Sequence, residues 1–79
     1  MDKEYLQLLK KMFVDSGEYS FKNEKLAEKF LKDVLWKAED QYSSEGYYHK
    51  YEDFKDFLYT HHVDAIAHWT YQDDYEEIA

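Results

Sequence analysis

Residues 23–42 read NEKLAEKFLKDVLWKAEDQY, and this segment predicts an amphipathic α-helix. Asn23 stands directly before the apolar pattern, where an asparagine side chain commonly caps the first turn. Trp36 falls on another side of the helix, where it either packs against a further part of the chain or contacts a partner. The core-facing residues follow one another at steps of four and therefore share one face: Leu26, Phe30, Val34, Ala38 and Tyr42.

A second amphipathic helix is predicted on the N-terminal side, over residues 2–14. Its apolar residues recur at steps of three and four, and Gly17 follows as a natural left-handed stop. Between the two helices, Tyr19 and Phe21 alternate with polar residues. We expect residues 18–22 to be a loop that folds both rings onto the core, with a short extended piece as the alternative.

Residues 43–46 read SSEG and predict a linker to the last third of the chain. One alternative for this last third is a single helix over about residues 48–75, on the order of 40 Å long. The other is a break near residues 60–62, with Thr60 capping a fourth helix whose core face is Val63, Ile66 and Ala67, with Tyr71 as a further candidate. We favour the break, because so small a globule offers little support for a long helix. The pattern behind both alternatives is a heptad-like seam at steps of four and three: Tyr47, Tyr51, Phe54, Leu58, His61, Ala65 and Trp69.

The composition supports an all-α fold, a small bundle of three or four helices in one domain over residues 1–79. The chain has no proline and only two glycines, so few tight turns interrupt it. Sixteen aromatic residues outnumber the twelve leucines, isoleucines and valines, so tyrosines must complete a thin core while some rings remain as contact surface. The apolar runs are too short to span a membrane. Without cysteine or a leader-like segment, we expect a soluble, cytoplasmic protein.

The histidines do not predict a metal site, and no cofactor is expected. His61 and His68 are two helical turns apart, about 10 Å along the axis, whereas one zinc ion requires ligands within about 2.2 Å. We expect His68 to pair with Asp64 instead, with His61 or His62 flanking the core. The serines lie in linker-like segments without a nucleophile elbow or a phosphate-binding loop, so the protein is predicted not to be an enzyme.

The charge of the chain is concentrated near its C-terminus. Residues 56–79 carry six carboxylates and no lysine, whereas the first 55 residues hold twelve acids and ten lysines. A negative surface repels phosphate backbones, and the absence of arginine removes the usual base-reading side chain. We therefore expect no direct nucleic-acid binding and a basic protein as partner. One interpretation of this charge is a solvated surface that keeps the protein soluble. Four of the acids, however, stand at a predicted helix C-terminus, where the helix dipole disfavours them. Either this segment is not helical in the free chain, or its charge serves something outside the chain.

The predicted contact surface combines these carboxylates with aromatic anchors. The charged members are Asp56, Asp64, Asp73, Asp74, Glu76 and Glu77, and the anchors are Trp69, Tyr71 and Tyr75. In size and composition the chain resembles the small acidic inhibitors that phages and mobile elements encode: DNA mimics, anti-restriction proteins and anti-CRISPR proteins. The resemblance implies inhibition of a basic nucleic-acid-handling protein. The alternative is a structural or accessory subunit that homo-oligomerises through the heptad-like seam.

Overall fold

The computed structural model describes residues 2–78, which form four α-helices and no β-strand. The prediction of a small all-α bundle is confirmed. The helices are α1 (Asp2–Lys10), α2 (Glu24–Ser44), α3 (Phe54–Phe57) and α4 (His61–Thr70). Two of them continue into π-helical turns, α1 into η1 (Lys11–Asp15) and α4 into η3 (Tyr71–Tyr75), and a 3₁₀ turn η2 (Tyr47–His49) follows α2.

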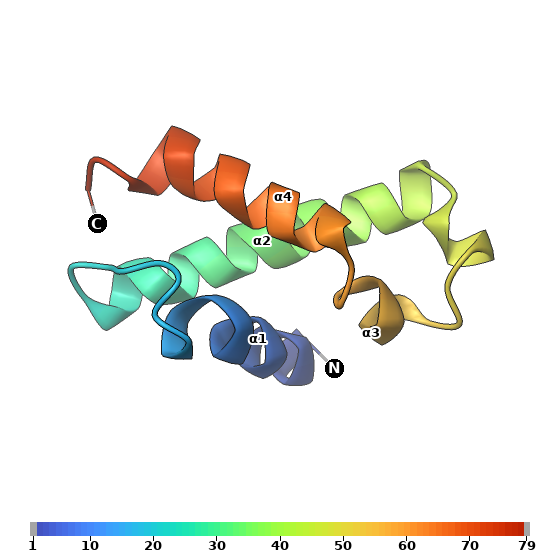
Figure 1. The fold of residues 1–79 in the computed structure, drawn as a ribbon, viewed down its shortest axis with the longest axis horizontal. Coiled ribbons are helices and arrows are strands. Elements are labelled where there is room, and N and C mark those ends of the chain that lie inside the picture. Colours follow the sequence, from blue (N-terminus) through green and yellow to red (C-terminus); the bar gives the residue numbers. More distant parts are fainter. Residues whose placement is uncertain (1, 79) are drawn as a thin grey trace.

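Helix α2 is the centre of the bundle. It contacts α1 on one side and α4 on the other, and it runs antiparallel to both (Figure 1). The domain measures 38 × 23 × 17 Å. Because the helices alternate in direction, the C-terminal end of the chain returns to the beginning of α2, while α3 lies beside the start of α1 (Figure 1).

The sequence explains where α2 begins and ends. Asn23 Oδ1 accepts a hydrogen bond of 2.9 Å from the Leu26 N–H, which caps the first turn as predicted. Phe30, Val34 and Ala38 are fully buried, so the step of four does define the core face. After Glu45, the chain turns through Gly46 at φ 75°, a left-handed conformation that glycine adopts without strain.

Aromatic rings fill the core around Phe30. The loop of residues 18–22 folds back as predicted, and it places the Tyr19 and Phe21 ring centroids 5.4 and 5.0 Å from that of Phe30. The rings of Tyr71 and Tyr75 approach Phe30 from η3, at 6.0 and 5.5 Å. These edge-on and tilted arrangements are the ones that aromatic rings prefer. The tyrosines thus supply apolar volume that the few aliphatic residues cannot.

The chain between residues 48 and 75 is divided, not one continuous helix. Helix α4 begins at His61 after the N-cap residue Thr60, in agreement with the predicted break. The prediction of a helix that starts near residue 48 is wrong. The Tyr47 and Phe57 ring centroids lie only 5.3 Å apart, whereas ten residues of straight helix would separate them by about 15 Å. Burial of these rings against each other therefore requires the chain to bend around them.

Because the chain is divided, the residues of the predicted heptad-like seam do not form one continuous helical interface. Tyr47, Tyr51 and Phe54 pack inward against the core, whereas His61 and Trp69 face solvent. The histidine that flanks the core is His62, whose ring centroid lies 4.7 Å from that of Tyr47. The seam residues therefore do not line one surface that a second helix could cover.

Candidate protein-binding site

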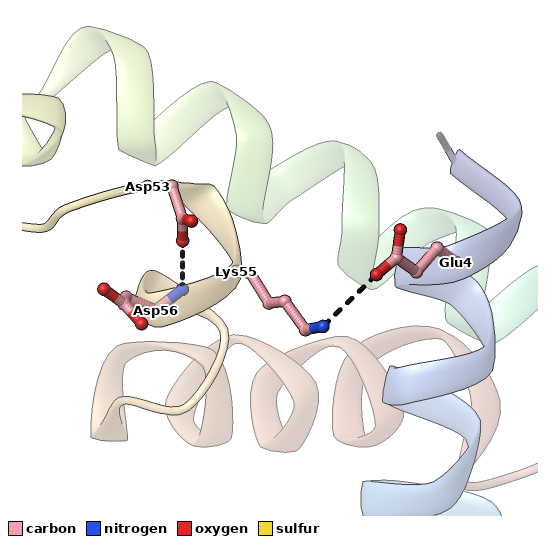
Figure 2. A network of polar contacts seen from close by, with 4 residues as sticks. All are labelled: Glu4, Asp53, Lys55 and Asp56. Carbon is pink, nitrogen blue, oxygen red and sulfur yellow. Dashed lines mark hydrogen bonds and ion pairs between the residues drawn. The ribbon is translucent and has the colours of Figure 1, made fainter.

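The predicted acidic surface does not include Asp56. This residue lies in α3, and its backbone N–H donates a 2.9 Å hydrogen bond to Asp53 Oδ1 (Figure 2). The preceding residue, Lys55, forms an ion pair with Glu4 on α1, with 3.2 Å between Nζ and Oε1. Helix α3 and the C-terminus lie toward opposite ends of the molecule (Figure 1). Asp56 therefore lies in the first turn of α3, apart from the other predicted carboxylates, and its assignment to the contact surface is corrected.

Asp64 lies in the first turn of α4, at the other end of this helix from the carboxylates that follow it. It pairs with His61, whose Nδ1 lies 3.8 Å from Asp64 Oδ2, so the predicted pairing with His68 is wrong. Burial raises the pKa of Tyr19, and the negative charges of Glu18 and Asp64 raise it further. The charge of Asp64 thus acts on the loop residue Tyr19.

Tyr75, one of the three predicted anchors, is part of the core. Its side chain is only 2% exposed, and its hydroxyl donates a short hydrogen bond to the Asp33 carboxylate on α2. Burial, together with the hydrogen bond to the charged Asp33, raises the pKa of the Tyr75 phenol. Tyr75 therefore attaches the end of η3 to α2 and offers no surface to a partner.

Tyr71 is also a packing residue. Its ring centroid lies 4.7 Å from that of Tyr19, and its hydroxyl donates a 3.0 Å hydrogen bond to the Ser20 carbonyl oxygen. The prediction of Tyr75 as an anchor is wrong, and Tyr71 is half-buried with its hydroxyl bonded within the chain. In a core with so few aliphatic residues, both rings are needed to cover Phe30.

Trp69 is the predicted anchor that remains on the surface, with 57% of its area exposed. It stands beside a groove between the second half of α2 and the end of α4. We call this surface the acidic groove, and its lining residues are Lys37, Asp40, Gln41, Ile66, Trp69, Thr70 and Asp73. The sequence predicted Trp69 and Asp73, but Asp40 joins them only because α2 and α4 pack side by side.

The floor of the acidic groove is organised by Thr70, which is fully buried. Lys37 Nζ donates a 3.1 Å hydrogen bond to Thr70 Oγ1, and that hydroxyl donates a 2.7 Å hydrogen bond to the Ile66 carbonyl oxygen. The one ammonium group of the groove is therefore held against its floor. Asp40 and Asp73 are exposed beside Trp69.

The other predicted carboxylates lie beyond the acidic groove, at the end of the chain. Asp74, Glu76 and Glu77 are all exposed. Their backbone is fixed at Tyr75, and Ile78, the residue after them, is 50% exposed. The structure thus brings four predicted carboxylates to the end of η3, counting Asp73, and leaves Asp56 and Asp64 elsewhere.

The sequence prediction missed a cationic surface on α1 and α2. Three neighbouring grooves share Lys32 as a lining residue, and we call their joint surface the lysine face. Its only acids are Glu28 and Glu39, so its formal charge is +4 and the rest of the chain carries −12. Trp36, 68% exposed, lies at its edge. The lysines are Lys3, Lys10, Lys22, Lys25, Lys29 and Lys32.

The described residues offer neither a cluster of metal-binding side chains nor a helix that could span a membrane. Residues 2–78 contain no group of three or more histidine, aspartate or glutamate side chains that could hold a metal ion. None of their helices combines the length and the apolar character needed to cross a bilayer. Comparison of the chain with protein-family models, with curated proteins and with solved structures finds no match.

Proposed function

We propose that this protein is a non-catalytic binding module that captures a cationic segment of a partner protein in the acidic groove. The observation that carries the proposal is the exposure of Trp69 in a groove that two carboxylates, Asp40 and Asp73, also line. Tryptophan is the residue type most enriched among the side chains that dominate binding energy, and burying it removes a large apolar area from water. A lysine or arginine of the partner would be attracted both by the indole face and by Asp40 and Asp73.

The arrangement of Lys37 supports a cationic ligand. An ammonium group at the mouth of the groove would repel a basic partner, but Lys37 donates its hydrogen bond downward to the buried Thr70. The carboxylates of Asp74, Glu76 and Glu77 extend the negative charge beyond the groove. Charges of this kind raise the association rate and fix the orientation of a partner more than they raise affinity.

The proposed consequence of binding is inhibition. Proteins that handle nucleic acids present basic surfaces to phosphate backbones, and an acidic module bound there would block access. This is the role implied by the resemblance to small acidic inhibitor proteins, with the cytoplasm as the proposed setting. Direct binding of nucleic acid by the acidic groove is not part of the proposal, because the groove has the wrong charge.

The test uses a synthetic ten-residue peptide of alternating arginine and glycine, with a glutamate–glycine peptide as the matched anionic probe. We expect the cationic peptide to quench Trp69 fluorescence in a W36A background and the anionic peptide to leave it unchanged. W69A should weaken binding of the cationic peptide about tenfold or more, measured by calorimetry. D40N/D73N should weaken it as well.

Tyr59→Ala is the control variant, because Tyr59 is equally exposed, at 62%, and does not line the acidic groove. It should bind the cationic peptide like the wild type. If W69A and D40N/D73N bind the cationic peptide with the affinity of Y59A, the acidic groove is not the binding site.

A further inference from the structure

The lysine face borders the acidic end of the chain. Ile78 lines the same groove as Lys22, Lys25 and Lys29, and Ile78 comes directly after Glu76 and Glu77. This proximity is fixed, because Tyr75 is buried and its hydroxyl bonds to Asp33 in the middle of α2. A positive area and a negative area therefore lie next to each other on one surface.

The two areas do not neutralise each other within the molecule. Among residues 2–78, no ion pair within 4.0 Å joins Lys25 or Lys29 to Glu76 or Glu77. Apolar groups lie in the same groove, because the half-buried Leu26 and the exposed Ile78 line it together with the lysines. The surface thus has an apolar middle and unpaired charges at its margins, which is the organisation of a protein–protein interface.

A surface with adjacent areas of opposite charge is complementary to itself after a two-fold rotation. In an isologous dimer, the contact of residue i with residue j of the partner is repeated as j with i. We propose that this protein forms a symmetric homodimer in which Lys25 and Lys29 of each subunit face Glu76 and Glu77 of the other, with Leu26 and Ile78 of both subunits at the centre. This interface is distinct from the heptad-like seam, whose aromatic residues are buried within the subunit.

The net charge of −8 on each subunit does not prevent such a dimer at physiological salt. The Debye length is then about 8 Å, which is shorter than the 17 Å minimum width of the subunit. Repulsion between the distant surfaces is screened, whereas contacts across the interface are screened much less. Dimerisation should therefore be stronger at about 0.15 M salt than at 0.01 M, where the Debye length is about 30 Å, and it should weaken again at 1 M.

The dimer does not depend on the proposed function. None of the residues that line the acidic groove lines the lysine face. Glu76 and Glu77, which lie beyond the groove, are the residues that both associations use, so the dimer leaves the groove itself open to a cationic segment. A dimer would present two acidic grooves, and a partner with two cationic segments would bind it with an avidity set by their effective concentration.

The experiment is a charge swap analysed by sedimentation equilibrium at 0.15 M salt. K25E/K29E places acids on both areas, and E76K/E77K places lysines on both, so each variant should have a dimer dissociation constant at least about tenfold higher than that of the wild type. When the two variants are mixed, every contact again joins opposite charges, and a one-to-one heterodimer should form. This recovery also shows that neither variant has failed by unfolding.

K11E/K50E is the matched control, because it reverses two lysines outside the lysine face. It should dimerise like the wild type. The proposal is overturned by a wild-type protein that is monomeric at millimolar concentration, by equal weakening in K11E/K50E, or by variants that do not associate when mixed. Binding of the cationic peptide, measured on K25E/K29E, which keeps Glu76 and Glu77, reports separately on the acidic groove.

Discussion

The hydrogen bond between Tyr75 and Asp33 allows a stringent test of the fold, through the substitution Y75F. The phenylalanine keeps the buried ring and its contacts with Phe30 and Phe21 at centroid distances of 5.5 and 6.1 Å. It removes only the hydroxyl that donates to the Asp33 carboxylate. Asp33 is half-buried, so solvent can replace part of what is lost. We therefore expect a loss of about 1.5 kcal/mol in the free energy of unfolding, the lower end of the range for hydrogen bonds to charged groups.

A loss of this size is easily measured in a domain of 79 residues. It corresponds to a decrease of about 6–12 °C in Tm, since such domains shift by roughly 4–8 °C per kcal/mol. Urea denaturation should show a lower midpoint with an unchanged slope. Y59F removes an exposed hydroxyl and should change stability by less than about 0.5 kcal/mol. A double-mutant cycle with D33N then isolates the energy that couples the two residues.

The same hydrogen bond predicts a pH dependence. The folded-state pKa of Tyr75 is raised above its ordinary value of 10.0, by burial and by the bond to Asp33. The folded protein therefore holds this proton more tightly than the unfolded chain. The contribution of the protonated Tyr75 to the free energy of unfolding is complete below pH 10 and is lost as the pH rises above that value. The stability advantage of the wild type over Y75F should shrink above pH 10. Equal stabilities of Y75F and the wild type at pH 7 would refute the assigned bond, as would a D33N cycle without coupling energy.

Two further predictions concern the linker and the charged end of the chain. G46A should lower the free energy of unfolding by about 1 kcal/mol, measured by urea denaturation. A Cβ at this position would meet no atom within 4 Å, so the cost comes from the backbone φ of 75°. G46N should recover part of the lost stability. Reversing four carboxylates to lysine (D73K/D74K/E76K/E77K) should leave the domain folded by circular dichroism and slow association with the cationic peptide at low salt by at least about tenfold; an unchanged association rate would remove the electrostatic part of the proposed function.

Local sequence patterns were sufficient to predict the parts of the fold that depend on neighbouring residues. Asn23 and the apolar residues at steps of four define α2 within its own sequence, and Gly17 marks the end of the first helix at φ 81°. The prediction of an α-helix was wrong over residues 48–53, where Tyr47, Tyr51 and Phe54 imitate a heptad. Their rings converge on Phe57 from a bent chain, and this convergence is a long-range packing effect that helical periodicity does not contain.

The same limit explains which site residues were predicted correctly. Tyr71 and Tyr75 lie in an acidic segment that resembles a surface, but α2 and the loop at Tyr19 cover them, so Tyr75 is buried and Tyr71 is half-buried. Asp40 enters the acidic groove only through the packing of α4 against α2, so no local pattern indicates it. The lysine face, in contrast, could have been predicted from the sequence. Lys22, Lys25, Lys29 and Lys32 recur at helical spacing, and their repetition on one face indicates a cationic surface that the overall charge of −8 conceals.

The position of the carboxylates at the end of η3 connects stability with binding. Negative charges at a helix C-terminus oppose the helix dipole, and Asp73, Asp74, Glu76 and Glu77 have no ion-pair partner within 4.0 Å among the described residues. The fold tolerates them because Tyr75 attaches this end to Asp33 and to the aromatic core, not because the charges stabilise it. Residues that weaken the isolated domain yet remain exposed are characteristic of a surface shaped for contact with another molecule. A cationic partner at the acidic groove and the lysine face of a second subunit would each compensate the unfavourable charge, so both associations should stabilise this end of the domain.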